Sequence, residues 1–188
     1  MKRLLIASFL VTACANPPGP ILAAALPNQP MLVIHSFENG LAGVHAANAN
    51  LKLNAQLDPN LSESVLVVDY PAPSDDPAAR DVWCDAQHRD WTSAHAIAFQ
   101  IKPTSALKLS VSFFDRNHVA YTAWAELKAG AWQPVRIAFD AIRPNPYFQR
   151  PDAKVGAALD VSDVTGIAFA PHDQASGRLS ISRLVVVD

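Results

Sequence analysis

The sequence predicts an all-β domain, folded as a two-sheet β-sandwich of the jelly-roll kind. Nine short runs are apolar or alternate between apolar and polar residues, the pattern of strands that bury one face. Turn-rich breaks separate the runs, and helical periodicity is weak throughout. Hydrophobic residues make up 50% of the 188 residues. That share is enough to fill the core of one domain of ordinary size.

The predicted strands follow one another at short intervals. They are residues 31–37, 51–57, 65–70, 96–101, 107–113, 119–127, 132–139, 164–170 and 179–187. Two longer interruptions, residues 71–92 and 143–160, are predicted to be loops. Loops of that length inside a compact domain are usually functional or disordered.

The first residues have the order of an export signal. Lys2 and Arg3 precede an apolar run at residues 4–11, which is far below the roughly 20 residues that span a bilayer. The run ends in Val-Thr-Ala-Cys, which resembles the bacterial lipobox. We therefore expect residues 1–13 to be a signal peptide and Cys14 to carry acyl chains. The alternative is an ordinary secretory leader that happens to contain Cys14.

Residues 14–30 hold five prolines and are predicted to form an extended linker between the lipidated cysteine and the β-sandwich domain, residues 31–188. Several acyl chains give stable membrane attachment, so the membrane is an expected partner through the anchor. Ala15 follows the cysteine, and the sorting rules of similar lipoproteins then favour the outer membrane. The expected location is the bacterial cell envelope.

Five segments resemble family-11-type carbohydrate-binding modules and the related domain of complex I intermediate-associated protein 30. In chain order they are 34–40 (IHSFENG), 90–102 with its Asp-Trp start, 130–139 (GAWQPVRIAF), 160–169 (DVSDVTGIAF) and 177–187 (GRLSISRLVVV). The resemblance implies a galactose-binding-like jelly roll and a ligand lying across a concave sheet. One fold hosts many functions, so it informs architecture more than activity.

The resemblance also implies a structural calcium site, and here the chain departs from the family. The acidic position of the last strand is Ser182, with Arg183 beside it. Calcium needs six to eight oxygen ligands, several of them charged. We therefore expect no cofactor and do not favour bound calcium. Glu38 is expected to accept hydrogen bonds from backbone N–H groups or from Arg183.

Sugar recognition needs flat aromatic rings and a few placed polar groups. Three polar and aromatic clusters meet that need, at residues 83–90, 115–118 and 147–150. The candidate ligand-binding residues are Trp83, His88, Asp115, Arg116, Tyr121 and Tyr147. Each has a structural alternative, because residues 115–118 suit a plain hairpin turn and Tyr147 suits a residue that pins its loop.

The other aromatic residues are assigned by pattern. Trp91 and Trp132 are expected in the core, as large aromatic side chains usually are. Tyr121 and Trp124 lie on opposite parities of one predicted strand, so one faces the core and the other the surface. The outward residue of the two is the ligand candidate.

No enzyme signature is present. Cys84 and His88 are four residues apart in a segment without helical pattern, so nothing brings a base to the thiol. With Cys14 lipidated, Cys84 has no partner for a disulfide and must be buried, paired outside the chain or used. No zinc-type spacing, nucleophile elbow or phosphate loop occurs. We expect no catalysis.

The net charge of −2 gives no reason to bind nucleic acid. The favoured function is a non-catalytic, carbohydrate-binding lipoprotein whose partner is a cell-envelope glycan. The alternative is a protein-interaction or assembly factor that contacts an envelope protein through a flat apolar patch. An enzyme ranks last.

Overall fold

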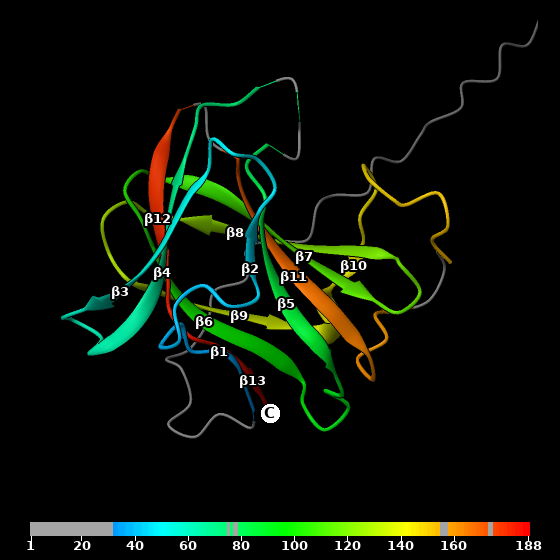
Figure 1. The fold of residues 1–188 in the computed structure, drawn as a ribbon. Coiled ribbons are helices and arrows are strands. Elements are labelled where there is room, and N and C mark those ends of the chain that lie inside the picture. The colour runs from blue at the N-terminus through cyan, green and yellow to red at the C-terminus, as the bar shows by residue number, and fades with distance from the viewer. Residues whose placement is uncertain (1–31, 75, 77–78, 155–157, 173–174) are drawn as a thin grey trace, which may run out of the picture.

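The computed structural model describes residues 32–74, 76, 79–154, 158–172 and 175–188. They form two antiparallel β-sheets packed face to face as a jelly-roll sandwich (Figure 1), which confirms the predicted fold class. The predicted signal peptide and linker, residues 1–30, lie outside the described residues, so those boundaries stay predictions.

One sheet has seven strands. They are β1 (Leu32–His35), β13 (Leu184–Val187), β6 (Ala96–Pro103), β12 (Gly177–Ile181), β4 (Glu63–Tyr70), β3 (Lys52–Asp58) and β9 (Gln133–Ala138). Strands β12 and β13 both pair with β6, at its two ends, and β9 pairs with it as well. The chain steps from β12 to β13 at Ser182, whose Oγ accepts a hydrogen bond from the backbone N–H of Gln100 at 2.7 Å.

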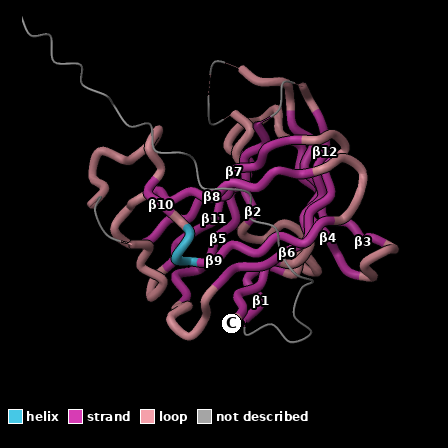
Figure 2. The backbone as a smooth tube through the Cα atoms, turned by 180° about the vertical axis from the view of Figure 1, so that it is seen from behind, coloured by secondary structure: helices cyan, strands magenta, loops and turns pink. Residues whose placement is uncertain are grey.

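The other sheet has six strands. In spatial order they are β10 (Arg143–Pro144), β8 (Ala120–Leu127), β7 (Leu107–Asp115), β11 (Val164–His172), β5 (Val82–Arg89) and β2 (Val44–Ala46). Among the described residues the only helical element is the short 3₁₀ turn η1 (Phe139–Ala141), which joins β9 to β10 (Figure 2). The sandwich therefore leaves the outer face of each sheet without a covering helix in the described part of the chain.

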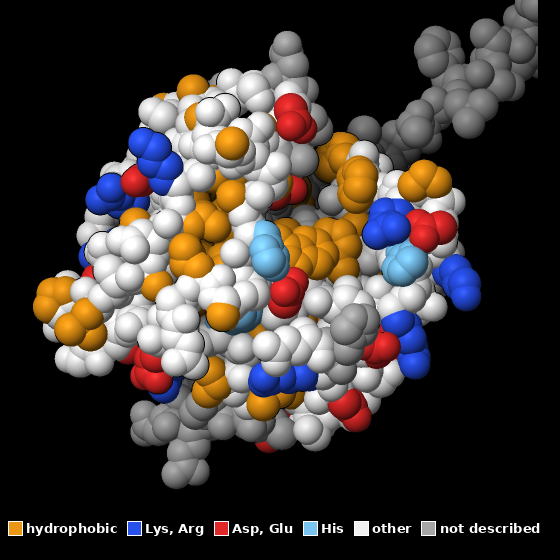
Figure 3. Space-filling model, viewed as in Figure 1, with side chains coloured by type: hydrophobic (Ala, Val, Ile, Leu, Met, Phe, Trp, Pro, Cys, Tyr) orange, Lys and Arg blue, Asp and Glu red, His pale blue; other side chains and the backbone are white. Residues whose placement is uncertain are grey.

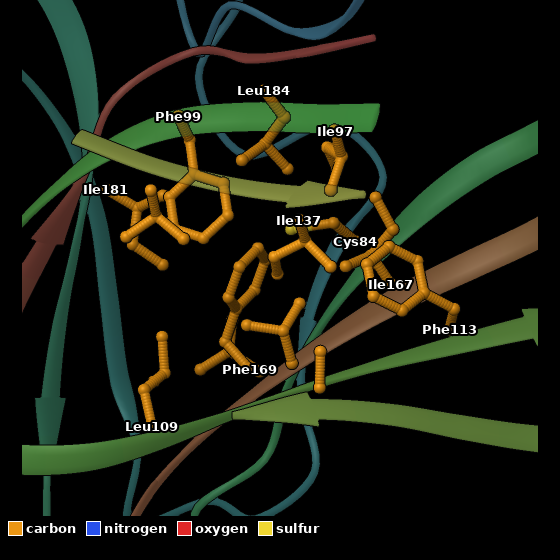
Figure 4. Packing of buried hydrophobic residues seen from close by; sticks show 14 of the residues in the cluster. Cys84, Ile97, Phe99, Leu109, Phe113, Ile137, Ile167, Phe169, Ile181 and Leu184 are labelled. Carbon is orange, nitrogen blue, oxygen red and sulfur yellow. The ribbon is translucent and has the colours of Figure 1, made fainter. Parts of the chain in front are cut away.

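The core fills the space between the two sheets (Figure 4). Phe99 of β6 meets Phe169 of β11 edge to face, with ring centroids 5.4 Å apart. Ile97 and Ile137 come from the seven-stranded sheet, and Ile167 comes from the six-stranded sheet. All five side chains are at most 1% exposed, so hydrophobic burial between the sheets holds the sandwich together.

Most predicted strands are observed. The short strands β2 and β10 were not predicted, and β10 begins the predicted loop 143–160. Two longer segments also need correction. The run 179–187 is two strands, β12 and β13, separated at Ser182. The predicted loop 71–92 contains a full strand, β5. Its inward residues Val82, Cys84 and Ala86 are buried, but its outward residues are large or polar. The alternation was therefore present in β5, and the polar outward residues made the segment look like a loop.

The two tryptophans expected in the core differ. Trp91 is 1% exposed and stacks on Phe139 with ring centroids 5.8 Å apart, as predicted. Trp132 is only half-buried, and the ammonium of Lys102 lies 5.0 Å from its ring centroid. The core prediction for Trp132 is wrong, because that residue precedes β9 and lies against the lysine of the neighbouring β6.

Candidate functional site

The outer face of the six-stranded sheet carries the aromatic side chains that the core does not use. Cross-strand register places Trp83 of β5, Ala168 of β11, Ser112 of β7 and Thr122 of β8 in one outward row. Trp124 lies two residues further along β8 on the same face. Figure 3 shows this side of the molecule. A hollow lies over β5, β11 and β7, hydrophobic side chains form its base, and a histidine lies beside it.

Trp83 lies against the backbone of β11. A Cβ atom added at Gly166 would come within 2.1 Å of Cζ2 of the Trp83 indole. Only a glycine therefore lets the ring rest at this point of the strand. Phe114, opposite Gly166 in register, packs beside the indole with ring centroids 4.5 Å apart and a tilt of 42°. The pair forms a supported aromatic platform on the sheet surface.

Asp85 fixes the platform from its polar edge. The indole N–H of Trp83 donates to Oδ1 of Asp85 at 2.8 Å, and Nε2 of His45 lies 3.2 Å from Oδ2. Partial burial raises the pKa of Asp85, but the hydrogen bonds from His45 and Trp83 outweigh burial, so the pKa lies below its ordinary value. Asp85 is thus held as a carboxylate beside the ring, where it can accept hydrogen bonds from hydroxyl groups.

Hydrogen bonds from other segments also hold the backbone of Asp85. Its N–H donates to the carbonyl of Gly43 at 2.8 Å, and its carbonyl oxygen lies 2.9 Å from Nε2 of His35. Burial lowers the pKa of His35, which favours its neutral form. The register of β5 against β11 shifts just after Asp85, and Gln87 takes a left-handed φ of 58° there. Such bulges re-aim side chains near sites.

A second aromatic group lies at the other end of the face. The ring centroids of Trp124 and His172 are 4.8 Å apart, and Nζ of Lys108 lies 4.6 Å from the centroid of the Trp124 ring. Nε2 of His172 is 2.9 Å from the hydroxyl of Ser110. This Trp124 platform has a lysine ammonium and an imidazole beside it, whereas the Trp83 platform has a carboxylate.

Tyr147 lies beyond β10, on a loop at the edge of the same sheet, yellow in Figure 1. It is 87% exposed, and Phe148 is 57% exposed. The loop is held by Asn145, whose Oδ1 accepts the backbone N–H groups of both residues, and by Gln149, whose amide bonds both backbone groups of Ala120. Asn145 and Gln149 therefore hold the loop in place, and the exposed side chain of Tyr147 does not.

Two predicted site residues point away from the surface. Tyr121 is fully buried and donates its hydroxyl hydrogen to the carbonyl of Ala158 at 3.1 Å. Burial raises its pKa to about 12. Asp115 is 1% exposed and accepts the backbone N–H groups of Asn117 and Asp160. The prediction that Tyr121 and Asp115 bind a ligand at the surface is therefore wrong. Tyr121 is one of the inward-facing residues of β8, and Asp115 holds the turn that follows β7.

The remaining candidates stand differently. Arg116 is exposed, and its Nη2 pairs with Asp160 at 2.7 Å. It lies in the same turn as Asp115, so the structural alternative for 115–118 accounts for both residues. His88 belongs to β5, but its side chain is outside what the structure describes. Of the predicted residues, Trp83 alone belongs to an aromatic platform on the outer face of the six-stranded sheet.

Cys84 is a core residue. Its thiol is fully buried, and burial raises its pKa to about 12, so at neutral pH it is neither ionised nor reachable. Of the three roles expected for Cys84, burial is the one observed. Within the described ranges no group of three or more His, Cys, Asp or Glu side chains is arranged to hold a metal ion. Arg183 pairs with Glu63 at 3.5 Å, not with the exposed Glu38.

Sequence reasoning missed several contributors. Three other strands, β2, β7 and β11, supply these residues, and only the sheet register brings them to Trp83, Asp85 or Trp124. They are Gly166, His45, Phe114, Lys108 and His172. The parity argument did identify Trp124 as the alternative to Tyr121. In the described part of the chain no helix is long and apolar enough to cross a membrane.

Comparison with protein-family models and with curated proteins finds no match. Comparison of structures finds a family 11 carbohydrate-binding module from Clostridium thermocellum, in complex with a β-1,3-1,4-mixed-linked tetrasaccharide. Its TM-score is 0.65 at 16% identity, over 82% of this chain and 94% of that chain. A family 30 carbohydrate-binding module of a cellulosomal cellulase from the same organism has a TM-score of 0.53 at 12% identity, over 87% and 95%.

An exo-β-agarase is also similar, with a TM-score of 0.57 at 14% identity, but this chain covers only 26% of it. The similarity is therefore to one part of that enzyme. At these identities the comparisons show the fold, a jelly roll like that of carbohydrate-binding modules.

Proposed function

We propose that this chain is a non-catalytic glycan-binding protein, and that its ligand lies on the outer face of the six-stranded sheet with one sugar ring against Trp83. The observation that carries the proposal is the supported indole. It rests on Gly166, its N–H is held by Asp85, and Phe114 packs beside it. A ring fixed in this way costs little conformational entropy when a ligand binds.

The chemistry around the ring suits a pyranose. The C–H face of a sugar packs on an aromatic face, and its hydroxyl groups need placed polar partners. Asp85 and His45 supply an acceptor and a polar ring nitrogen at one edge of the indole. The half-buried Ser112 adds a hydroxyl further across the sheet, 3.2 Å from the hydroxyl oxygen of the buried Thr122.

The comparisons support this function at the level of the fold. The similar family 11 module was solved with a tetrasaccharide, and the five sequence segments noted above resemble the same kind of module. We therefore propose a relationship to family-11-type modules, with the related assembly-factor domain as the other branch of that resemblance.

The proposed location follows from the N-terminal residues. Export, acylation at Cys14 and attachment to the outer membrane would hold the sandwich near envelope glycans. Metabolic labelling with a palmitate analogue tests this step. Label should enter the native chain, and the Cys14→Ser chain should carry none and leave the membrane fraction.

Replacing Trp83 by alanine tests the glycan site. The purified protein is screened against soluble glycans by affinity gel electrophoresis, and each hit is titrated by calorimetry. Loss of the ring should weaken binding about tenfold or more, since aromatic contacts of this size are worth about 1–2 kcal/mol. Trp132→Ala, on the other sheet, is the matched control and should bind as the native protein does.

The screen also decides the proposal. If glycans bind equally well to the native protein and to Trp83→Ala, the site is elsewhere. If no glycan binds and the protein instead captures an envelope protein, the protein-interaction function replaces this one. The exposed Tyr147 and Phe148 favour that alternative, and the double variant Tyr147→Ser/Phe148→Ser should then abolish capture.

A further inference from the structure

We propose that the Trp124 platform, defined by Trp124, Lys108, His172 and Ser110, receives a sugar unit that carries a carboxylate, so that the glycan bound by this face is acidic. The inference rests on the proposed function and names the class of its ligand. Uronic acid units are pyranoses of this kind, with a carboxylate in place of the hydroxymethyl group.

The position of Lys108 is the first observation. Its register partner across the β7–β8 pair is Glu126, an opposite charge that would normally attract it. The ammonium lies instead over the ring of Trp124, at 4.6 Å from the centroid. No ion pair joins Lys108 to a carboxylate of any described residue. An exposed cation–π contact is weak, so a sugar can displace the flexible chain from the ring and keep the ammonium within reach.

His172 and Ser110 complete the platform from neighbouring strands. His172 is opposite Lys108 in the β11–β7 register, so the two basic side chains are adjacent on the surface. Its ring tilts against Trp124, and its Nε2 is 2.9 Å from the hydroxyl of Ser110. The Ser110 hydroxyl is buried and holds the imidazole in place, so an anion over this point would meet the lysine ammonium and the exposed imidazole, which together suit a carboxylate.

The opposite end of the face has the opposite charge. Trp83 is bordered by the carboxylate of Asp85, which would repel an acidic unit. Trp124 is on β8 and Trp83 is on β5, with β7 and β11 between them. At ordinary strand spacing the two residues are therefore separated by roughly 14 Å across the sheet. Since the repeat of an extended β-linked glycan is close to one strand spacing, the two platforms contact different sugar units.

A matched glycan pair tests the inference. The full chain is titrated with neutral xylotetraose and with glucuronate-substituted xylotetraose, which leaves neutral units for the Trp83 end. The acidic member should bind about tenfold more tightly at low salt. That preference should shrink as NaCl increases, because salt screens an exposed ion pair.

Lys108→Gln identifies the residue responsible. It removes the charge, keeps a long polar side chain, and should abolish most of the preference for acidic sugars. Lys52→Gln on β3 of the other sheet makes the same change in net charge and should leave the preference intact.

The outcomes separate the two claims. Neutral glycans that bind as well as their acidic partners, or an acid preference that survives Lys108→Gln, overturn this inference and leave the proposed function standing. Absence of binding to every glycan, neutral or acidic, overturns the proposed function itself.

Discussion

The outer faces of the two sheets follow the same alternation of side chains and differ in what they carry. On the seven-stranded sheet, Ala96, Ala98, Val185 and Val187 form a small aliphatic cluster with at most 4% exposure. On the six-stranded sheet, the corresponding outward positions include Trp83 and Trp124. Outward-facing positions are therefore necessary for a binding face but do not make one by themselves. Supported aromatic rings with polar partners distinguish the site.

The charged residues of the two sheets differ in the same way. On the seven-stranded sheet Arg178 forms two hydrogen bonds with Asp69, at 2.6 and 3.0 Å, so those charges are paired within the protein. On the six-stranded face Lys108 pairs with no described carboxylate, and Asp85 is held only by Trp83 and His45 among its hydrogen-bonding side chains. A face whose charges are not paired with each other retains them for a ligand.

Two glycines provide the sharpest test of this comparison. A Cβ at Gly166 would lie 2.1 Å from the Trp83 ring, and a Cβ at Gly177 would lie 2.5 Å from the hydroxyl of Tyr70 on the other sheet. Gly166→Ala and Gly177→Ala should each lower the free energy of unfolding by about 1–3 kcal/mol, because the ring must move. Only Gly166→Ala should weaken glycan binding, by tenfold or more. Urea unfolding and calorimetric titration measure the two effects.

A double-mutant cycle checks the cause of the first effect. In a Trp83→Ala background, Gly166→Ala should cost almost nothing in stability, because the clashing ring is gone. A cost that persists in the double variant would mean that the alanine disturbs β11 itself. Equal loss of binding in the Gly177→Ala protein would remove the distinction between the two sheets.

The sequence predicted the sandwich because burial between two sheets enforces period-two alternation, and that signal is local. Strands such as β6 and β7 show it plainly. It failed at β5, since Trp83, Asp85 and Gln87 occupy the outward positions and resemble a loop. That failure coincides with the candidate site, because a binding face places unusual residues where an ordinary strand has simple polar ones.

The site itself was predicted less well, for a non-local reason. Trp83 was identified by its residue type, but Gly166 is 83 positions away and His45 lies 40 residues from Asp85. Their meeting depends on which strands pair and in what register, information that no single segment contains. Tyr121 and Trp124 show the limit clearly, since parity separated them but could not say which one faced the core.

Two carboxylates at strand ends, one in each sheet, should respond to pH with opposite sign. Asp58 is buried, and burial raises the pKa of its carboxyl group. Hydrogen bonds from the backbone N–H groups of Asn60 and Leu61, together with nearby Lys102, lower the pKa by more than burial raises it. The pKa of Asp58 is therefore below its ordinary value. Its stabilising effect is present at neutral pH and is lost as pH falls through that lowered pKa. Burial raises the pKa of Asp81 to about 6. The folded protein therefore loses stability as pH rises from about 4 through 6, because the buried carboxyl group must then ionise.

Asp58→Asn should therefore destabilise the protein at pH 7 by about 1–2 kcal/mol, through weakened hydrogen bonds and loss of the charge near Lys102. Asp81→Asn should stabilise it at pH 7 by about 1 kcal/mol, less than the full pKa shift implies because part of the carboxyl is open to solvent. Thermal unfolding at pH 5 and pH 8 measures both. Destabilisation by Asp81→Asn at pH 8 would show that its carboxylate is needed in the fold.

The smallest expected effect concerns the charge beside Trp83. Asp85→Asn keeps an acceptor for the indole N–H but removes the negative charge, so neutral glycans should bind about three- to tenfold more weakly through lost charge-assisted hydrogen bonds. Asp69→Asn, which breaks the ion pair with Arg178 on the other sheet, should leave binding within twofold. If Asp85→Asn instead binds acidic glycans more tightly at the expense of neutral ones, Asp85 excludes carboxylates from the Trp83 end. Unchanged affinity for both classes would mean that Asp85 only orients the ring.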